Sequence, residues 1–275
     1  MSVSLGSRKD FDSFRSYLER VCGILLGDNK EYLVSSRLRT IMEEQKLTNL
    51  SELVERIERN SQLREKVVDA MTTNETLWFR DAHPFRILRE QLLPELSKEK
   101  RPIDIWCAAS STGQEPYSIS IELEEYKRKN PGALTGERII ATDISPTALD
   151  IARKAEYEKL VLSRGMTDEY LKRYFKEVQE GRWKLNPEIT NRVQYRSLNL
   201  LHTYSMLGRF DLVFCRNVLI YFSSDLKLDI LRRMHGVLKP GGYLFLGASE
   251  SLSGLSDLYE MRQCSPGIIY RKKGS

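Results

Sequence analysis

A run of small residues, Ala108 to Gly113, lies between an apolar stretch and a segment with helical periodicity. The stretch from Ile103 to Cys107 is typical of a short buried strand, and the helix after the turn should begin near Glu115 or Pro116. Such a turn lies at the carboxyl end of the first strand of a doubly wound sheet. Small side chains there let a nucleotide-like ligand approach the backbone.

A second apolar run, Arg138 to Thr142, ends in Asp143, and a carboxylate at this point can accept both hydroxyls of a ribose. The turn has Gly113 as its only glycine, which argues against a dinucleotide because a pyrophosphate needs the closest backbone approach. A nucleoside without phosphate, such as S-adenosylmethionine, needs no such glycines. The alternative is a turn that binds nothing, as in many α/β proteins.

Length and composition set broad limits. The 275 residues allow one large or two modest domains, and the net charge of +5 neither requires nor excludes a nucleic-acid or anionic-membrane role. The four scattered cysteines indicate buried thiols in a reducing compartment, without a zinc site. The N-terminus lacks an apolar leader, and no stretch is long enough to span a membrane, so we expect a cytoplasmic protein.

The first part of the chain is expected to be entirely helical. Asn49 and Glu52 form a capping pair that should open the third of four helices. The first helix should run from about Lys9 to Leu26, bury Val21 and Leu25, and end at Gly27-Asp28. The second, from about Lys30 to Lys46, should bury its apolar positions, which are Tyr32, Leu33, Leu38, Ile41 and Met42.

Arginines are frequent in this helical part, at positions 37, 39, 56, 59 and 64. They could present a basic face to an acidic partner, or they could be solvated side chains paired with nearby glutamates. The segment Thr72 to Asp81 then interleaves polar groups with Trp78 and Phe79, which a plain linker would not carry. Those aromatic residues join one domain to the other, or the polar groups between them face a ligand, or both.

The rest of the chain predicts an α/β domain with a mixed sheet. A small hairpin over Phe175 to Leu185 should be inserted after the second strand. The strongest strand, Phe210 to Cys215, leads directly to Arg216-Asn217, at the edge where open α/β sheets bind ligands. The other expected elements are helices over Pro84–Leu96, Pro146–Ala155, Asp168–Tyr174 and Ser224–Leu238, a turn at Lys239–Gly242, and strands at Val193–Arg196, Tyr243–Gly247 and Gly267–Arg271.

Several motifs together resemble the CheR family, the chemotaxis receptor protein-glutamate O-methyltransferases. They are TTNETLWFRD, WCAASSTGQEPYS, ATDIS, the pair Asn199-Leu200, FDLVFCRNVLIYF and LKPGGYLFLGASE. The resemblance implies a class I S-adenosylmethionine-dependent methyltransferase with a Rossmann-like doubly wound sheet. An all-α N-terminal domain (1–71) should be followed by a linker (72–83) and the catalytic domain (84–275), which contains an inserted β-subdomain over about 156–192.

The resemblance also implies the site residues. The cofactor S-adenosylmethionine, and its product S-adenosylhomocysteine, should contact Asn74, Thr76, Arg80, Glu115, Asp143, Asn199, Leu200, Arg216 and Asn217. Gln114 stands where many members have glutamate, a place that should tolerate an amide. Arg80 or Arg216 should orient the substrate carboxylate, with Tyr221 beside it, although Tyr221 could equally be a core residue. No metal is expected.

The implied activity is methyl transfer to glutamates in the cytoplasmic part of chemoreceptors, which tunes sensory adaptation. The partners would be the receptor's helical bundle, contacted through Arg37 and Arg39, and in some members a receptor C-terminal tether peptide bound by the β-subdomain. We expect a monomer recruited to receptor arrays, without nucleic acid or membrane insertion. Two alternatives stay open: a non-catalytic regulatory module that binds the cofactor, and a methyltransferase of the same fold with another substrate.

Overall fold

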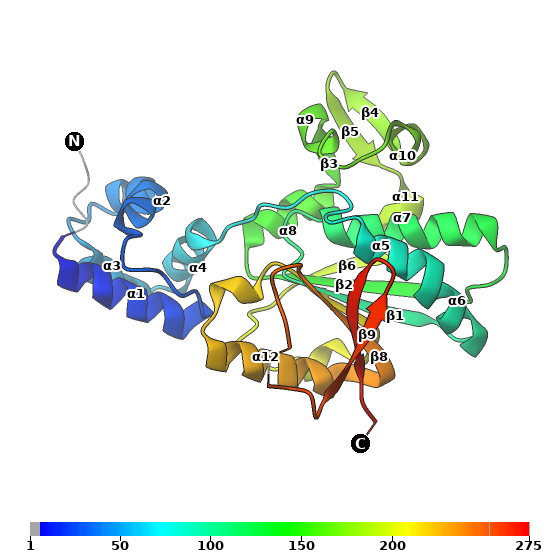
Figure 1. The fold of residues 1–275 in the computed structure, drawn as a ribbon. Coiled ribbons are helices and arrows are strands. Elements are labelled where there is room, and N and C mark those ends of the chain that lie inside the picture. The colour runs from blue at the N-terminus through cyan, green and yellow to red at the C-terminus, as the bar shows by residue number, and fades with distance from the viewer. Residues whose placement is uncertain (1–5, 253, 275) are drawn as a thin grey trace. The chain divides into compact units, whose positions relative to one another are not determined.

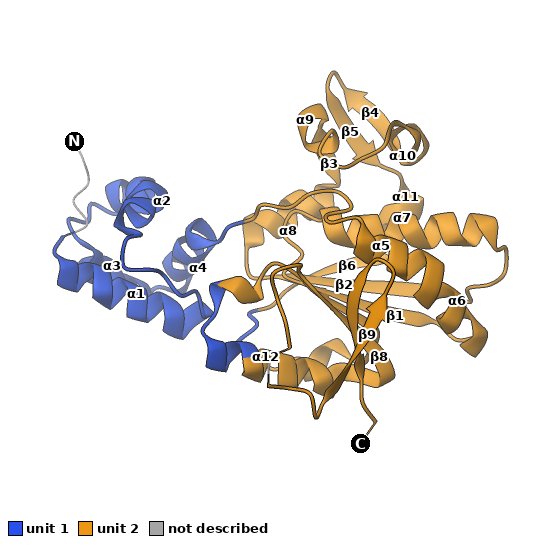
Figure 2. Cartoon of the chain, in the orientation of Figure 1, with its two compact units in different colours: residues 1–73, 199–201, 221–227 blue, residues 74–198, 202–220, 228–275 orange. Residues whose placement is uncertain are grey.

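The computed structural model describes residues 6–252 and 254–274, which fall into two compact units (Figure 2). Unit 1 contains the described residues up to 73, together with 199–201 and 221–227. Unit 2 contains residues 74–198, 202–220 and the described residues from 228 onward.

Unit 1 is built on four helices, as the apolar spacing predicts. Asn49 caps the third helix by accepting from the backbone N–H of Glu52, and Asn60 caps the fourth in the same way through Leu63. The helices are α1 (Arg8–Cys22), α2 (Glu31–Glu44), α3 (Leu50–Arg59) and α4 (Ser61–Met71).

Two local expectations for unit 1 are wrong. The first helix ends at Cys22 rather than near Leu26, because Gly23 takes a left-handed conformation (φ 78°) and its N–H bonds to the carbonyl of Glu19. Leu25 is consequently half exposed. On the second helix Tyr32 is 71% exposed and Val34 is buried instead, because the inward face follows the four-residue spacing of Val34, Leu38 and Met42.

Unit 2 contains a seven-stranded sheet in the order β6-β2-β1-β7-β8-β10-β9. The first five strands in this order are parallel, and β10 runs antiparallel to both its neighbours, so the predicted mixed sheet is confirmed. The strands are β1 (Ile103–Ala108), β2 (Glu137–Asp143), β6 (Val193–Ser197), β7 (Phe210–Cys215), β8 (Leu238–Leu246), β9 (Tyr259–Cys264) and β10 (Gly267–Lys272).

Helices cover both faces of this sheet (Figure 1). On one face lie α5 (His83–Ile87), a π-helical turn η1 (Leu88–Leu92), α6 (Leu93–Leu96), α7 (Gln114–Lys129) and α8 (Pro146–Lys154). On the other lies α12 (Ser224–Val237). The expected helix over Pro84–Leu96 is present, but it widens into the π turn ahead of Pro94, whose missing N–H cannot continue an α-helical ladder.

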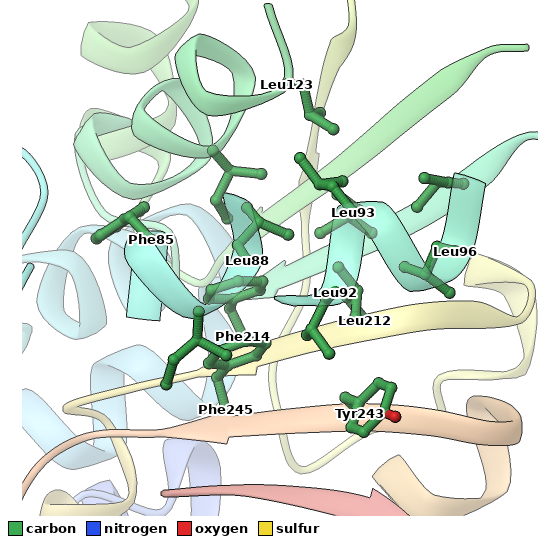
Figure 3. Close-up of a cluster of buried hydrophobic side chains, with 14 of the residues drawn as sticks. Phe85, Leu88, Leu92, Leu93, Leu96, Leu123, Leu212, Phe214, Tyr243 and Phe245 are labelled. Atoms are coloured by element: carbon green, nitrogen blue, oxygen red, sulfur yellow. The ribbon is translucent and has the colours of Figure 1, made fainter. Parts of the chain in front are cut away.

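The main core of unit 2 lies between the sheet and the α5–α6 segment (Figure 3). Alternate residues of the strands point into it, and Phe214 stacks on Phe245 with 4.2 Å between the ring centroids. Leu88, Leu92 and Leu93 close it from the helical side. Burial of this apolar layer fixes the strand ends that carry the candidate site.

Two further expectations for unit 2 need correction. Lys239 to Gly242 do not form a turn after the helix, because they belong to β8, where the pairing with β7 shifts register between Phe210 and Leu212. Strand β9 was not predicted, since its exposed Glu260, Met261 and Gln263 give an edge strand no apolar pattern.

The inserted segment of unit 2 forms a second, three-stranded sheet in the order β3-β5-β4. The expected hairpin is confirmed as β4 (Phe175–Gln179) and β5 (Arg182–Leu185), and β3 (Glu156–Glu158) joins it. The remaining short elements are α9 (Lys159–Leu162), α10 (Asp168–Tyr174), α11 (Pro187–Thr190), η2 (Ser97–Glu99), η3 (Ser205–Leu207) and η4 (Leu219–Tyr221).

Candidate functional site

The turn after β1 is tightly wound. Ala109 and Ser111 have positive φ angles (57° and 50°), and Gly113 follows with φ 97°. A Cβ atom on Gly113 would lie 2.8 Å from the hydroxyl oxygen of Tyr195 and 3.0 Å from that of Tyr157. The two tyrosine hydroxyls therefore pack closely against the turn, and only small residues fit its conformation.

Asp143, at the end of β2, is held against this turn. One carboxylate oxygen accepts the N–H of Ser111 (2.7 Å) and the other accepts the N–H of Ser145 (2.9 Å). The side chain is buried. Two backbone donors thus fix the carboxylate at the carboxyl edge of the sheet, where a ribose acceptor is expected.

The linker reaches the same turn through Asn74. The Asn74 side-chain amide donates to Ser145 Oγ (3.2 Å), and the Asn74 backbone carbonyl accepts from Ser111 Oγ (2.9 Å). Thr76 and Arg80 follow within the same segment. Trp78 is buried, with its ring 5.0 Å from that of Tyr157 and 5.5 Å from that of Phe175. This tryptophan anchors the linker onto the inserted part of unit 2.

Arg216 is an enclosed charged group of the site, with a side chain only 1% exposed. Its guanidinium donates to Glu115 (2.8 Å), to Asp81 (2.7 Å) and to the carbonyl of Arg80 (3.0 Å). Its Nε is buried without a hydrogen-bond partner among residues 6–252 and 254–274. Burial raises the pKa of Glu115, and the neighbouring Arg216 opposes that rise. Arg216 therefore ties the linker to the first turn of α7.

Asn217 follows Arg216 with a left-handed backbone (φ 58°), and its N–H donates to Glu250 (2.9 Å). The Arg80 side chain is partly exposed, and its Nη1 makes a long contact of 3.5 Å to the backbone carbonyl of Glu75. The structure thus brings Asn74, Arg80, Glu115, Asp143, Arg216 and Asn217 into unit 2, with Thr76 between the first two.

Three sequence-predicted residues group instead with unit 1. The Asn199 amide donates to the carbonyl of Val21 (2.8 Å) and its oxygen accepts from the N–H of Leu201. Leu200 is buried. Tyr221 is partly exposed rather than a core residue, and its carbonyl accepts from the N–H of Leu25 (2.8 Å).

Sequence reasoning missed Ser111, Ser145, Asp81 and Glu250. Ser145 could have been found, because a serine before Pro146 is a common helix cap, and its hydroxyl does accept from Ala148 N–H. Glu250 lies within a motif that carried the family resemblance, but nothing local indicated its partners. Asp81 also lies within such a motif, but nothing local indicated its partner, because Arg216 is 135 positions away.

This set of residues fits S-adenosylmethionine. The turn packs its backbone closely but offers a single glycine, and the Asp143 carboxylate is fixed beside it, as a nucleoside without phosphate requires.

Within residues 6–252 and 254–274 no group of three or more His, Cys, Asp or Glu could hold a metal ion. In the same part of the chain, no helix has the length and apolarity needed to cross a membrane. The four cysteines are buried and free.

The fold and these residues define a class I S-adenosylmethionine-dependent methyltransferase with a separate all-α part. The chain belongs to the CheR methyltransferase family. Residues 74–268 match the CheR methyltransferase SAM binding domain, and residues 9–72 match the CheR methyltransferase all-alpha domain. The cofactor is therefore S-adenosylmethionine.

Several relatives are similar along nearly their whole length. The chain is 57% identical to Chemotaxis protein methyltransferase 1 of Pseudomonas aeruginosa, covering 96% of this chain and 98% of that protein. It is 56% identical to Chemotaxis protein methyltransferase Cher2 of Pseudomonas putida, with the same coverage of both chains. It is 51% identical to Chemotaxis protein methyltransferase of Vibrio anguillarum, covering 97% and 98%.

Proposed function

We propose that this enzyme transfers the methyl group of S-adenosylmethionine to the side-chain carboxylate of specific glutamates in the cytoplasmic part of chemoreceptors. The resulting glutamyl methyl esters would tune sensory adaptation. The observation that carries this proposal is the near full-length similarity to chemotaxis protein methyltransferases. The partly exposed guanidinium of Arg80 supplies a positive charge for a substrate that is itself an anion.

The reaction needs little from protein acids or bases. When bound, the cofactor supplies a methyl group on a positively charged sulfur. The sulfur keeps the electron pair of the broken C–S bond as the new O–C bond forms. A receptor glutamate is already ionised at neutral pH, because its ordinary pKa is about 4.3. The protein therefore has to orient the reactants, an effect that can supply roughly 7–11 kcal/mol.

The two arginines divide this task in our proposal. Arg216 has both terminal nitrogens committed to protein oxygens, so we assign it to positioning the linker. The partly exposed Arg80 guanidinium is better suited to orient the incoming carboxylate. Tyr221 is proposed as a second substrate contact because its side chain is partly exposed. Thr76, Asn199, Leu200 and Asn217 complete the proposed cofactor contacts.

We propose that unit 1 engages the receptor's helical bundle. Arg39 is exposed on α2 and is suited to meet receptor carboxylates. Arg37, the other proposed contact, also donates to the carbonyls of Met71 and Thr72 and to Thr73 Oγ1. The three-stranded sheet is the proposed place for a receptor tether peptide, since β4 is an edge strand of that sheet. The enzyme would act as a cytoplasmic monomer recruited to arrays through the receptor.

The test is transfer of a labelled methyl group from S-adenosylmethionine to receptor-bearing membranes, followed by treatment with base. We expect label on the receptor that is released as methanol, because glutamyl methyl esters hydrolyse in alkali. Alkali-stable label would indicate another substrate, and binding of S-adenosylhomocysteine without any transfer would indicate a regulatory module. Either outcome would overturn the proposal.

The matched variants are Arg80→Ala and Asp143→Ala. Arg80→Ala should lower kcat or raise the KM for receptor, while Asp143→Ala should abolish calorimetric binding of S-adenosylhomocysteine. Unchanged turnover and unchanged cofactor affinity in Arg80→Ala would show that Arg80 has neither role.

A further inference from the structure

Glu250 lies in the loop after β8 and joins two strand ends. One of its carboxylate oxygens, Oε2, accepts the N–H of Asn217 (2.9 Å) and the N–H of Gly247 (2.7 Å). Asn217 follows β7 and Gly247 follows β8, and these strands pair in parallel up to Cys215 and Leu246. A single oxygen therefore holds together the carboxyl ends of two neighbouring strands, at the edge where the cofactor binds.

The packing around this oxygen is tight. A Cβ atom on Gly247 would lie 2.7 Å from Glu250 Oε2 and 2.9 Å from both the backbone nitrogen and the amide nitrogen of Asn217. Asn217 also has a left-handed backbone (φ 58°), a conformation that residues other than glycine adopt at a cost in free energy. The Glu250 carboxylate stabilises this conformation and so fixes where the Asn217 side chain starts.

The second oxygen of Glu250 is different. Oε1 is buried and has no hydrogen-bond partner in the part of the chain that the structure describes. A buried carboxylate oxygen without a donor is costly unless a positive charge lies near it. Arg216, the residue before Asn217, donates to Glu115 and Asp81 instead. Carboxylates thus outnumber guanidinium groups at this edge of the sheet.

The Glu250 charge also reaches its neighbours. It contributes to raising the pKa of Glu115 and of the Cys215 thiol, although burial is the larger cause for both. The negative field of Glu250 therefore extends over the end of β7 and the start of α7, which carry proposed cofactor contacts. A positively charged ligand would relieve this field.

We propose that Glu250 is a positioning residue of the S-adenosylmethionine site that has two effects. Through Oε2 it holds Asn217 and Gly247 in place, and through its charge it favours the positively charged cofactor over the product, whose sulfur is uncharged. The inference rests on the cofactor and not on the identity of the methyl acceptor. Glu250 thereby makes the product bind more weakly than the cofactor, which favours release of the product.

The test is calorimetric titration of the full chain with S-adenosylmethionine and with S-adenosylhomocysteine, at one pH and salt concentration. The ratio of the two dissociation constants isolates the sulfonium charge, because the ligands share their nucleoside and amino-acid ends. Glu250→Gln keeps an oxygen acceptor and removes the charge. We expect it to weaken the binding of S-adenosylmethionine about tenfold and that of S-adenosylhomocysteine much less, since a unit charge roughly 12 Å away has an effect of this size at an effective dielectric constant of about 20.

Gly247→Ala separates the two effects. It forces a methyl group toward Asn217 and Glu250 without changing any charge, so both ligands should weaken and their ratio should stay as in the unchanged protein. Glu260→Gln, which removes an exposed carboxylate on β9, is the control and should leave both affinities unchanged. Thermal unfolding of each variant shows that it is folded.

Three results would overturn the inference. If the ratio of the two dissociation constants in Glu250→Gln equals that of the unchanged protein, the Glu250 charge has no effect on the choice of ligand. Unchanged affinities for both ligands in Gly247→Ala would remove the positioning effect. The same loss in Glu260→Gln as in Glu250→Gln would show a general effect of net charge. None of these measurements uses a methyl acceptor, so they fail or succeed independently of the receptor proposal.

Discussion

Gly113 shows how much of the cofactor site depends on one residue. Its φ of 97° suits only glycine, and two tyrosine hydroxyls occupy the space that a Cβ would need. We expect Gly113→Ala to lower the affinity for S-adenosylhomocysteine more than tenfold and to cost more than about 1 kcal/mol of folding free energy. Calorimetric titration and urea unfolding measure the two effects.

The matched control is Gly132→Ala, at a glycine that has a similar φ (74°) and open space around it. It should cost only the backbone strain and leave ligand affinity unchanged. Equal affinities for Gly113→Ala and Gly132→Ala would contradict a role for close packing under the turn.

Glu122 is a buried residue whose ionisation should be visible in stability. Its carboxylate contacts Arg89 Nη1 through both oxygens (3.1 and 3.0 Å), yet burial raises its pKa from 4.5 to about 7. The folded state then holds this proton more tightly than the unfolded chain, so the contribution to stability falls as pH rises from about 4.5 through about 7.

We expect the free energy of unfolding of the unchanged protein, relative to Glu122→Gln, to fall by on the order of 2 kcal/mol between about pH 5 and about pH 8. Urea unfolding at a series of pH values measures this difference. Parallel pH profiles for the two proteins would show that Glu122 does not titrate in this window.

At the scale of elements, the inserted segment and the linker support each other. The N–H of Trp78 donates to the carbonyl of Arg164 (3.2 Å), and a Cβ on Gly165 (φ 109°) would lie 2.1 Å from the carbonyl oxygen of Trp78. Gly165→Ala must therefore displace the linker. We expect a loss of stability of about 1–3 kcal/mol and a several-fold loss of S-adenosylhomocysteine affinity.

Gly181→Ala in the β4–β5 hairpin provides the comparison, because Gly181 also has a positive φ (73°) but nothing within 4 Å of its would-be Cβ. Affinity should change in Gly165→Ala and not in Gly181→Ala. A linker that is independent of the inserted segment would give two variants with the same affinity.

Helix α2 carries two arginines with different surroundings. Arg37 donates to the last carbonyls of α4 and to Thr73, whereas Arg39 is exposed. We expect Arg37→Ala to lower the unfolding free energy by about 1–3 kcal/mol, because it leaves partly buried carbonyls without donors. Arg39→Ala should leave stability unchanged and raise the KM for receptor. Equal stability of the two variants would contradict this division.

At the scale of the whole molecule, charge should govern the encounter with the receptor more than the binding of the cofactor. The chain carries 43 Lys and Arg against 38 Asp and Glu, and the arginines of unit 1 are mostly at its surface. The Debye length is about 8 Å at about 0.15 M salt, so exposed charges are screened while buried ones are screened less.

Raising salt from about 0.05 M to about 0.5 M should therefore increase the KM for receptor several-fold and change S-adenosylhomocysteine affinity by less than about twofold. Methylation kinetics and calorimetry over the same salt series measure both. A constant KM would mean that apolar contacts, rather than the basic face of unit 1, hold the receptor.

The sequence by itself determined most helices and strands, and the polar or small residues at the ends of the first two strands. Hydrophobic periodicity is a local property, so it placed the four helices, the hairpin and the strand that ends at Cys215. It failed where the pattern is weak or interrupted, as at the polar edge strand β9, at the early end of α1 and at the register shift in β8. Asp143 and the small-residue turn were visible because strand ends and turns have local signatures.

Only the tertiary structure decided which polar groups meet. Arg216 donates to residues 135 and 101 positions away, and Glu250 reaches Asn217 across 33 positions. Trp78 lies against Tyr157 and Phe175 of the inserted segment. No periodicity reports such pairs, because they are selected by how the strand ends and loops pack around one edge of the sheet, and that packing is a property of the folded chain as a whole.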